Sequence, residues 1–115
     1  MTEACIFCQI ARHESPAEIL YEDELVIAFQ DLRPIAPVHL LVVPKRHIAS
    51  VNELTTGDEE LLGYMILVAR DLAHRLQVEE SGYRLILNTG PDAGQTIFHL
   101  HLHVIGGRKL MIRLP

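Results

Sequence analysis

The sequence FHLHLHVIGG, residues 98–107, alternates histidine with aliphatic residues and then reaches two glycines. Successive side chains of a β-strand point to opposite faces of a sheet. We therefore predict a strand from His99 to Ile105. Its three histidines share one face, while the intervening leucines and Val104 enter the core. Threonine, lysine or glutamate is the usual choice for a solvated strand face, so this row of histidines indicates a functional site.

A row of imidazoles on one strand face suits two kinds of chemistry. Histidines two residues apart can ligate zinc or another transition metal. Alternatively, one imidazole attacks phosphorus, because a neutral imidazole is nucleophilic near pH 7 and its second nitrogen can be held by a hydrogen bond. The preceding loop favours the second interpretation, since Gly94-Gln95-Thr96 offers backbone, amide and hydroxyl donors to phosphate oxygens. A metal site would more often add an Asp or Glu close by, and none follows the triad.

Length, charge and cysteine content narrow the classes of function. The chain has 115 residues, the size of a single domain, 1–115. Ten Lys+Arg against fifteen Asp+Glu give a net charge of -5, which excludes a broad cationic surface for nucleic acid but not a local site for a small nucleotide. We expect no membrane partner, because no apolar run approaches the roughly 20 residues that span a bilayer. The lack of a secretory signal and the presence of only two cysteines predict a cytoplasmic protein.

The rest of the chain predicts short strands around one long helix. Thr56 to Glu59 has the spacing of a capping box, and Gly82 is expected to close the helix. The apolar residues of this helix recur on one face: Leu61, Met65, Val68, Leu72 and Leu76. The other expected elements are a short helix at about Cys5–Ala11 and strands at Ile19–Glu22, Leu25–Phe29, Val38–Val43 and Tyr83–Leu87. This pattern predicts an α+β fold with an antiparallel sheet.

The histidine segment resembles the motif of the histidine triad (HIT) superfamily, in which three histidines alternate with hydrophobic residues. The resemblance covers essentially the whole chain and is strongest to the nucleotide-binding, or Hint, branch. It also rests on Ile6-Phe7, Phe29-Gln30-Asp31, Pro34-Ile35-Ala36-Pro37-Val38-His39, Val43-Pro44-Lys45-Arg46-His47, Asn88 and Gly94-Gln95-Thr96. It implies a HIT-like fold with a five-stranded antiparallel sheet, one long and one short helix per protomer, and a homodimer whose sheet continues across the interface.

The resemblance also implies an activity, the hydrolysis of phosphoramidates of purine nucleoside 5′-monophosphates through a nucleotidyl-histidine, without a cofactor for catalysis. The implied catalytic residues are His101 as the nucleophile, His103, His39 and Thr96. The implied nucleotide-binding residues are Asp31 at the ribose hydroxyls, Asn88, Gly94 and Gln95 near the phosphate, and Ile6, Phe7 and Leu32 around the base. A short carboxylate can accept both hydroxyls of a cis-diol, and apolar side chains give a purine a face to rest on.

The two cysteines, Cys5 and Cys8, have the spacing of zinc ligands but supply only two of the four that a structural site needs. Some bacterial HIT proteins resemble this chain in starting with the same C-x-x-C unit and are thought to hold structural zinc with two histidines. By position, those histidines are His47 and His99. The alternative is a pair of buried thiols without metal.

One departure from the Hint pattern concerns the end of the chain. Lys109–Pro115 contains no tryptophan, whereas Hint proteins commonly have a Trp-containing tail beside the neighbouring active site. The preferred leaving group therefore stays open. Two other functions also stay open, a nucleotide-binding module with incidental turnover and a metal-dependent hydrolase that uses the triad as ligands.

The nucleophile itself leads to a geometric prediction. An imidazole attacks through an unprotonated nitrogen, so the other nitrogen of His101 must carry the proton. Because no carboxylate lies near the triad in the sequence, we expect that proton to be donated to the main-chain carbonyl of His99. The free nitrogen should then face a cavity lined by Asn88, Thr96 and His103, with His103 partly protonated and able to donate to the leaving amine.

Overall fold

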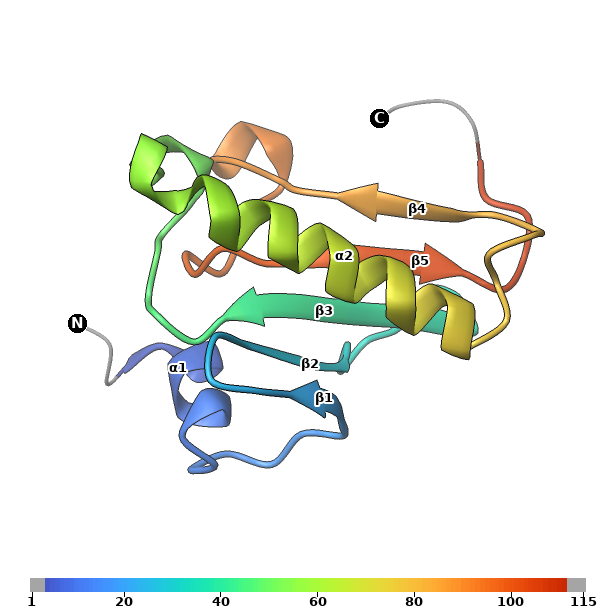
Figure 1. The fold of residues 1–115 in the computed structure, drawn as a ribbon, viewed down its shortest axis with the longest axis horizontal. Coiled ribbons are helices and arrows are strands. Elements are labelled where there is room, and N and C mark those ends of the chain that lie inside the picture. Colours follow the sequence, from blue (N-terminus) through green and yellow to red (C-terminus); the bar gives the residue numbers. More distant parts are fainter. Residues whose placement is uncertain (1–3, 112–115) are drawn as a thin grey trace.

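Five antiparallel strands in the order β1-β2-β3-β5-β4 form the framework of the chain, in a computed structural model that describes residues 4–111 (Figure 1). The strands are β1 (Ile19–Glu22), β2 (Val26–Gln30), β3 (Val38–Pro44), β4 (Tyr83–Ile86) and β5 (Leu102–Gly106). The helices are the short α1 (Ile6–Ala11) and the long α2 (Glu59–Arg75), with single 3-10 turns at Val51–Glu53, Thr56–Asp58 and Pro91–Ala93. The predicted α+β class and five-stranded antiparallel sheet are confirmed.

The two helices cover opposite faces of the sheet. Met65, Val68 and Leu72 of α2 pack on the face formed by alternate residues of β2, β3 and β5. Each of these side chains is buried, which contributes on the order of 2 kcal/mol per residue. On the other face, Phe7 and Ile10 of α1 pack against β2 and β3. The remainder of that second face carries the histidines, so α2 forms the core and α1 borders the site.

The histidine strand begins later than expected, at Leu102 and not at His99. Its pairing with β3 begins at Leu102 opposite Val42. Before Leu102 the main chain is not paired with β3: the Leu100 amide donates to the carbonyl of Ile48. The alternation still holds, since Leu100, Leu102 and Val104 all enter the core with α2.

Both ends of α2 also differ from the sequence prediction. The capping box forms one residue earlier, where the Asp58 carboxylate accepts from the Thr55 amide at 2.9 Å, and it caps the 3-10 turn Thr56–Asp58 that precedes α2. The helix ends at Arg75, well before Gly82. Gln77 takes a left-handed conformation with φ of 64°, and the Val78 amide turns back to the carbonyl of Ala73, which stops the helix there.

Candidate functional site

His101 has one nitrogen bonded to the backbone and one available. Its Nδ1–H donates to the carbonyl oxygen of His99 at 2.7 Å, as the sequence predicts. A carbonyl only accepts, so this contact fixes the proton on Nδ1 and leaves the lone pair on Nε2. Among residues 4–111, Nε2 of His101 has no hydrogen-bond partner. The side chain is half-buried and set up to attack an electrophile through that nitrogen.

His39 and His103 form a chain of hydrogen bonds beside the nucleophile. The Ile35 amide donates to Nδ1 of His39 at 3.1 Å, which places the proton of His39 on Nε2. That Nε2–H donates to Nδ1 of His103 at 3.0 Å. Nε2 of His103 therefore carries a proton and can donate it in a hydrogen bond to a ligand. The sequence gives no sign of the role of Ile35, because its contribution is a backbone N–H.

A carboxylate lies next to this chain, contrary to the expectation that none is near the triad. Asp31 follows β2, and its Oδ2 lies 3.3 Å from Nε2 of His39. The Arg33 amide donates to its Oδ1 at 2.8 Å and holds the carboxylate in place. The sequence could not show this contact, because β2 and β5 are joined only through the intervening β3.

His103 is neutral near pH 7, which corrects the expectation of partial protonation. Burial lowers its pKa to about 4, and the neighbouring His101 and His39 add to this effect. Burial also lowers the pKa of His39, although the charge of Asp31 opposes the shift. His103 can therefore donate a hydrogen bond to phosphate but is not a proton reservoir for the leaving group.

Most hydrogen-bond donors of the loop after β4 already have acceptors within the protein. The Gly94 amide bonds to Pro91, and the buried Gln95 side chain donates to the carbonyls of Ala49 and Ile97. Asn88 donates from Nδ2 to the carbonyl of Ala93 at 2.8 Å. Thr96 is exposed and lines a cavity of about 460 Å³, whose lining includes neither Asn88 nor His103. The lining of that cavity also lacks His101, so the predicted cavity that joins Asn88, Thr96 and His103 around Nε2 of His101 is not found there.

The three side chains expected around the base differ in accessibility. Leu32 is 73% exposed, and Ile6 is half-buried on the wall of the same cavity as Thr96. Phe7 is only 5% exposed and packs between other rings. Leu32 and Ile6 therefore offer surface to a ligand, whereas the ring of Phe7 belongs to the interior.

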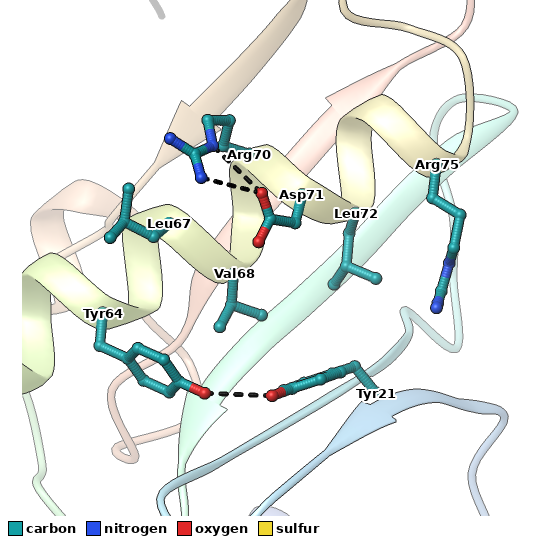
Figure 2. A pocket seen from close by; sticks show the side chains of 8 residues that line it. All are labelled: Tyr21, Tyr64, Leu67, Val68, Arg70, Asp71, Leu72 and Arg75. Carbon is teal, nitrogen blue, oxygen red and sulfur yellow. Dashed lines mark hydrogen bonds and ion pairs between the residues drawn. The ribbon is translucent and has the colours of Figure 1, made fainter.

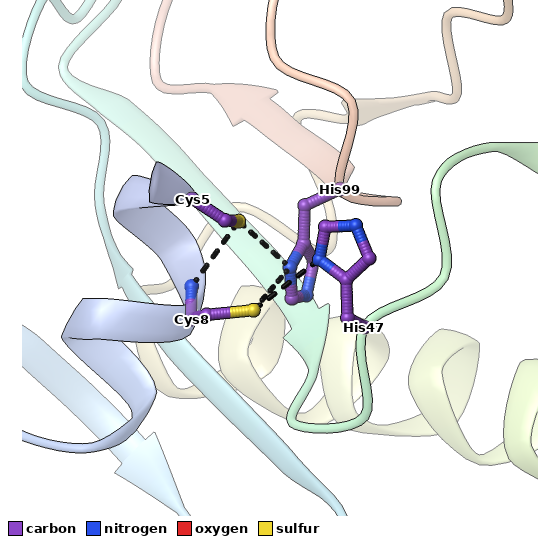
Figure 3. Close-up of side chains that lie close together, drawn as sticks. All are labelled: Cys5, Cys8, His47 and His99. Carbon is purple, nitrogen blue, oxygen red and sulfur yellow. Dashed lines mark hydrogen bonds between the residues drawn. The ribbon is translucent and has the colours of Figure 1, made fainter. Parts of the chain in front are cut away.

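Cys5, Cys8, His47 and His99 meet at one point, with their ligand atoms all within 4.8 Å of one another (Figure 3). Nδ1 of His99 lies 3.2 Å from the Cys5 sulfur and 3.5 Å from the Cys8 sulfur, and Nδ1 of His47 lies 3.2 Å from the Cys8 sulfur. Two sulfurs and two imidazole nitrogens are the donor set of a tetrahedral zinc site.

His99 is oriented for this cluster by a second contact. Its Nε2–H donates to the carbonyl of Pro44 at 2.8 Å, so the lone pair of Nδ1 points at the sulfurs. The ring is fully buried, and burial lowers its pKa to about 4. Burial also raises the pKa of the Cys8 thiol to about 11, with the nearby Cys5 adding to the shift. A cation is the natural partner for sulfurs in this setting, so the residues fit zinc.

This geometry divides the triad between two centres. His99 faces the thiols, while His101 bonds to a carbonyl and His103 to His39. In the described part of the chain, the three triad imidazoles do not converge on one point as metal ligands. His103 instead lies with Asp31 and His39 in a second group whose ligand atoms are close together, so the triad histidines do not share one candidate metal site.

A separate cavity of about 340 Å³ lies between α2 and β1 (Figure 2). Tyr21 and Tyr64 meet there at 3.0 Å between their hydroxyl oxygens, and both hydroxyls donate to Oδ2 of Asp23. The cavity contains none of the histidines or cysteines. These contacts tie α2 to the start of the sheet, and we assign them a structural role.

Within residues 4–111, no helix combines the length and apolar character needed to cross a membrane.

Comparison with known proteins places this geometry in a family. Residues 12–110 match the HIT domain family. The purine nucleoside phosphoramidase of Escherichia coli K12 is 46% identical over 110 residues, which cover 96% of this chain and 92% of that protein. A HIT family hydrolase from Clostridium thermocellum superposes with a TM-score of 0.94 at 46% identity, covering 98% of both chains.

A zinc-bound histidine triad family protein from Mycobacterium smegmatis superposes with a TM-score of 0.84 at 33% identity, covering 98% of this chain and 84% of that one. The family match spans most of the chain, and the matched region contains all three triad histidines. The expected histidine triad resemblance is confirmed, and the chain belongs to the HIT domain family.

Proposed function

We propose that this protein hydrolyses phosphoramidates of purine nucleoside 5′-monophosphates, with His101 as the nucleophile. The observation that carries the proposal is the hydrogen bond from Nδ1 of His101 to the His99 carbonyl, which leaves Nε2 unprotonated on an accessible face. The name of the Escherichia coli relative supports both the phosphoramidate bond and the purine. The chain is otherwise a member of a family of hydrolases, and these finer assignments are ours.

The first step forms a bond between Nε2 of His101 and the α-phosphorus, and the P–N bond breaks. The departing nitrogen keeps the bonding electron pair and takes a proton from solvent, because His103 is neutral. The imidazole becomes cationic, and its Nδ1–H bond to the His99 carbonyl strengthens. Water then attacks phosphorus, releases the nucleoside monophosphate and one proton, and restores neutral His101.

The other residues bind the substrate around this centre. Nε2–H of His103 and the Thr96 hydroxyl donate to phosphoryl oxygens, and His39 keeps His103 in the donating tautomer. Asp31 accepts the ribose hydroxyls, while Leu32 and Ile6 contact the base. Asn88, Gly94 and Gln95 act through the loop whose shape they fix, and so place Thr96.

We propose that Cys5, Cys8, His47 and His99 hold a structural zinc ion, which the donor set and the zinc-bound relative support. When bound, zinc ties α1 to the start of the triad segment and takes no part in the hydrolysis. Reduced thiols are needed for this role, which suits the cytoplasm. Elemental analysis should give one zinc per chain, and Cys8→Ser should lose it.

We also propose that the protein is a homodimer that pairs along β4. β4 is a terminal strand of the sheet that residues 4–111 form, so within that range one side of its backbone has no strand partner. Leu85 on β4 and Ile66 on α2 are exposed apolar residues. The apolar residues of β3 and the inner face of α2 are buried against each other within one protomer, so they are not the contact surface.

Steady-state hydrolysis of adenosine 5′-monophosphoramidate tests the catalytic proposal. His101→Ala should lose turnover by several orders of magnitude yet still bind AMP, because only the covalent route is removed. His74→Ala is the matched control, since His74 is exposed on α2, and should keep full activity. Undiminished turnover by His101→Ala, or AMP binding with no turnover by the wild type, would refute the proposal.

A further inference from the structure

The loop of residues 31–37, which joins β2 to β3, contributes a main-chain donor to the histidines of the site. The Ile35 amide donates to Nδ1 of His39 at 3.1 Å, and Nε2–H of His39 donates to Nδ1 of His103 at 3.0 Å. These two bonds keep the proton of His103 on Nε2, where it can be donated to a ligand. The state of His103 therefore depends on where the loop holds the Ile35 amide.

Burial of apolar side chains does little to hold this loop in place. Leu32 is 73% exposed and Ile35 is 59% exposed. Arg33, Pro34 and Pro37 are exposed as well. A segment with few buried apolar contacts opens locally at a low cost in free energy. The position of the Ile35 amide thus depends on the hydrogen bonds that the loop backbone makes.

Arg108, which follows the histidine strand β5, provides such a bond. Its Nη2 donates to the Ile35 carbonyl at 2.8 Å, and its Nη1 donates to the Lys109 carbonyl at 3.0 Å. Two acceptors fix the direction of the planar guanidinium, and a charged donor makes the stronger kind of hydrogen bond. Ile35 is therefore held on both sides, through its N–H by His39 and through its carbonyl by Arg108.

Gly107 brings Arg108 close to the loop. Gly107 has a φ of 90°, in the left-handed region that favours glycine, and a Cβ there would lie 2.9 Å from Cβ of Pro37. The chain after β5 thus turns directly against the last residue of the loop. Through this turn and the bond to Ile35, the strand that carries His103 also holds the loop that determines its tautomer.

We propose that Arg108 is a positioning residue, which keeps the Ile35 amide in its bond to His39. When that amide moves away, Nδ1 of His39 can take the proton, and Nε2 of His39 then accepts from Nδ1–H of His103. In this second tautomer, Nε2 of His103 has no proton to donate to phosphate. The Asp31 carboxylate still favours the first tautomer, because it lies 3.3 Å from Nε2 of His39, so the effect is partial. The inference rests on the proposed function, since it concerns a donor to the phosphoryl group.

Arg108→Met and Lys109→Met form a matched pair, because both remove an exposed cation but only Arg108 bonds to Ile35. With adenosine 5′-monophosphoramidate, Arg108→Met should lower kcat about fivefold, because His103 donates to phosphate for less of the time. KM should stay within about twofold of wild type, since the Asp31 amide keeps its bond to the His39 carbonyl. Arg108→Lys retains a donor for the Ile35 carbonyl and should restore most of kcat, and Lys109→Met should match the wild type.

Two measurements by NMR test the positioning role without turnover. Hydrogen exchange of the Ile35 amide should be about tenfold faster in Arg108→Met, because the loop opens more often. Nitrogen shifts of the His103 ring should indicate one tautomer, protonated at Nε2, in the wild type and in Lys109→Met, and an average of two in Arg108→Met.

A single Nε2–H tautomer of His103 in Arg108→Met, a raised KM at constant kcat, or equal effects of the two methionine variants would overturn the inference. If the wild type has no turnover, the proposed function fails. The NMR comparison of Arg108→Met with Lys109→Met then supports or overturns the positioning role by itself.

Discussion

At the scale of single residues, main-chain groups decide which nitrogen of each imidazole is protonated. The Ile35 amide determines which nitrogen of His39 is protonated, and His39 in turn determines the tautomer of His103. The His99 carbonyl fixes the proton of His101 on Nδ1, and the Pro44 carbonyl fixes the proton of His99 on Nε2. Each tautomer follows from a partner that can only donate or only accept. The fold therefore prepares the chemistry of the site before a substrate arrives.

The neutral state of His103 leads to a prediction about stability and pH. Its pKa is about 4 in the folded chain, below the unfolded value of about 6.5. Between these values the unfolded chain binds the extra proton and the folded chain does not, so stability falls as the pH drops from 6.5 to 4. His103→Asn should remove on the order of 2 kcal/mol of that decline, measured by urea unfolding at both pH values. An unchanged decline in the variant would contradict the assignment.

What the sequence reveals at this scale depends on distance along the chain. The His101 side chain contacts a carbonyl only two residues away in the sequence, that of His99, and the strand pattern predicts this contact. The approach of Asp31 and His39 to His103 depends on strand register, with Leu41 opposite His103, which the pattern does not specify. The low pKa of His103 arises from the same long-range packing and was missed for the same reason.

At the scale of elements, tertiary contacts shift boundaries that local patterns only approximate. Thr55 and Thr56 both suit a cap ahead of α2, and the contacts of Asp58 with Thr55 and Arg46 select Thr55, which caps the 3-10 turn before the helix. His99 leaves the ladder of β5 because its ring is held by Pro44 and the thiols. Within residues 4–111 the sequence predicts both α-helices and all five strands but not the 3-10 turns, and partners far away in the chain set the ends of these elements.

The contact between α2 and β1 supports a prediction at this scale. Burial would raise the pKa of Asp23, but hydrogen bonds from Tyr64, Tyr21 and two backbone amides outweigh it and lower the pKa to about 2. The ionised group therefore stabilises the fold above about pH 4, and this contribution is lost as the pH falls toward 2.

Asp23→Asn should accordingly lower the free energy of unfolding by about 1–2 kcal/mol at pH 7. The difference from wild type should shrink below pH 4 in urea unfolding. Glu24→Gln is the matched control, because Glu24 is the exposed neighbour of Asp23, and should change little. A constant difference between wild type and Asp23→Asn from pH 7 to pH 2 would argue against this network.

At the scale of the whole molecule, the sheet has the larger hydrophobic core on one face and the histidines and cysteines of the two sites on the other. α2 seals one face, and the opposite face combines the thiol–imidazole cluster next to α1 with the histidines around His101. His99 belongs to both centres, through its ring and through its carbonyl. The sequence analysis predicts the members of both centres and both roles of His99, whereas only the fold shows the contacts of His39 with Asp31 and His103.

The proposed dimer makes a prediction at this scale. Light scattering at micromolar concentration should give twice the 13.0 kDa of one chain. Leu85→Lys should shift the protein toward the monomer, because it replaces an exposed apolar side chain of the terminal strand by a charged one. Leu25→Lys changes an exposed leucine in the turn between β1 and β2 and should leave the dimer intact. A wild-type mass of one chain would contradict the proposal.

The proposed mechanism requires a covalent bond between His101 and the nucleotide, and mass spectrometry detects such a bond directly. The protein is mixed briefly with adenosine 5′-monophosphoramidate, quenched and digested, and the modified peptide is fragmented to locate the added adenylyl group. We expect the adenylyl group on His101, and no such group in His101→Ala. An adduct on His99 or His103, or rapid turnover by the wild type with no adduct at any time after mixing, would contradict it.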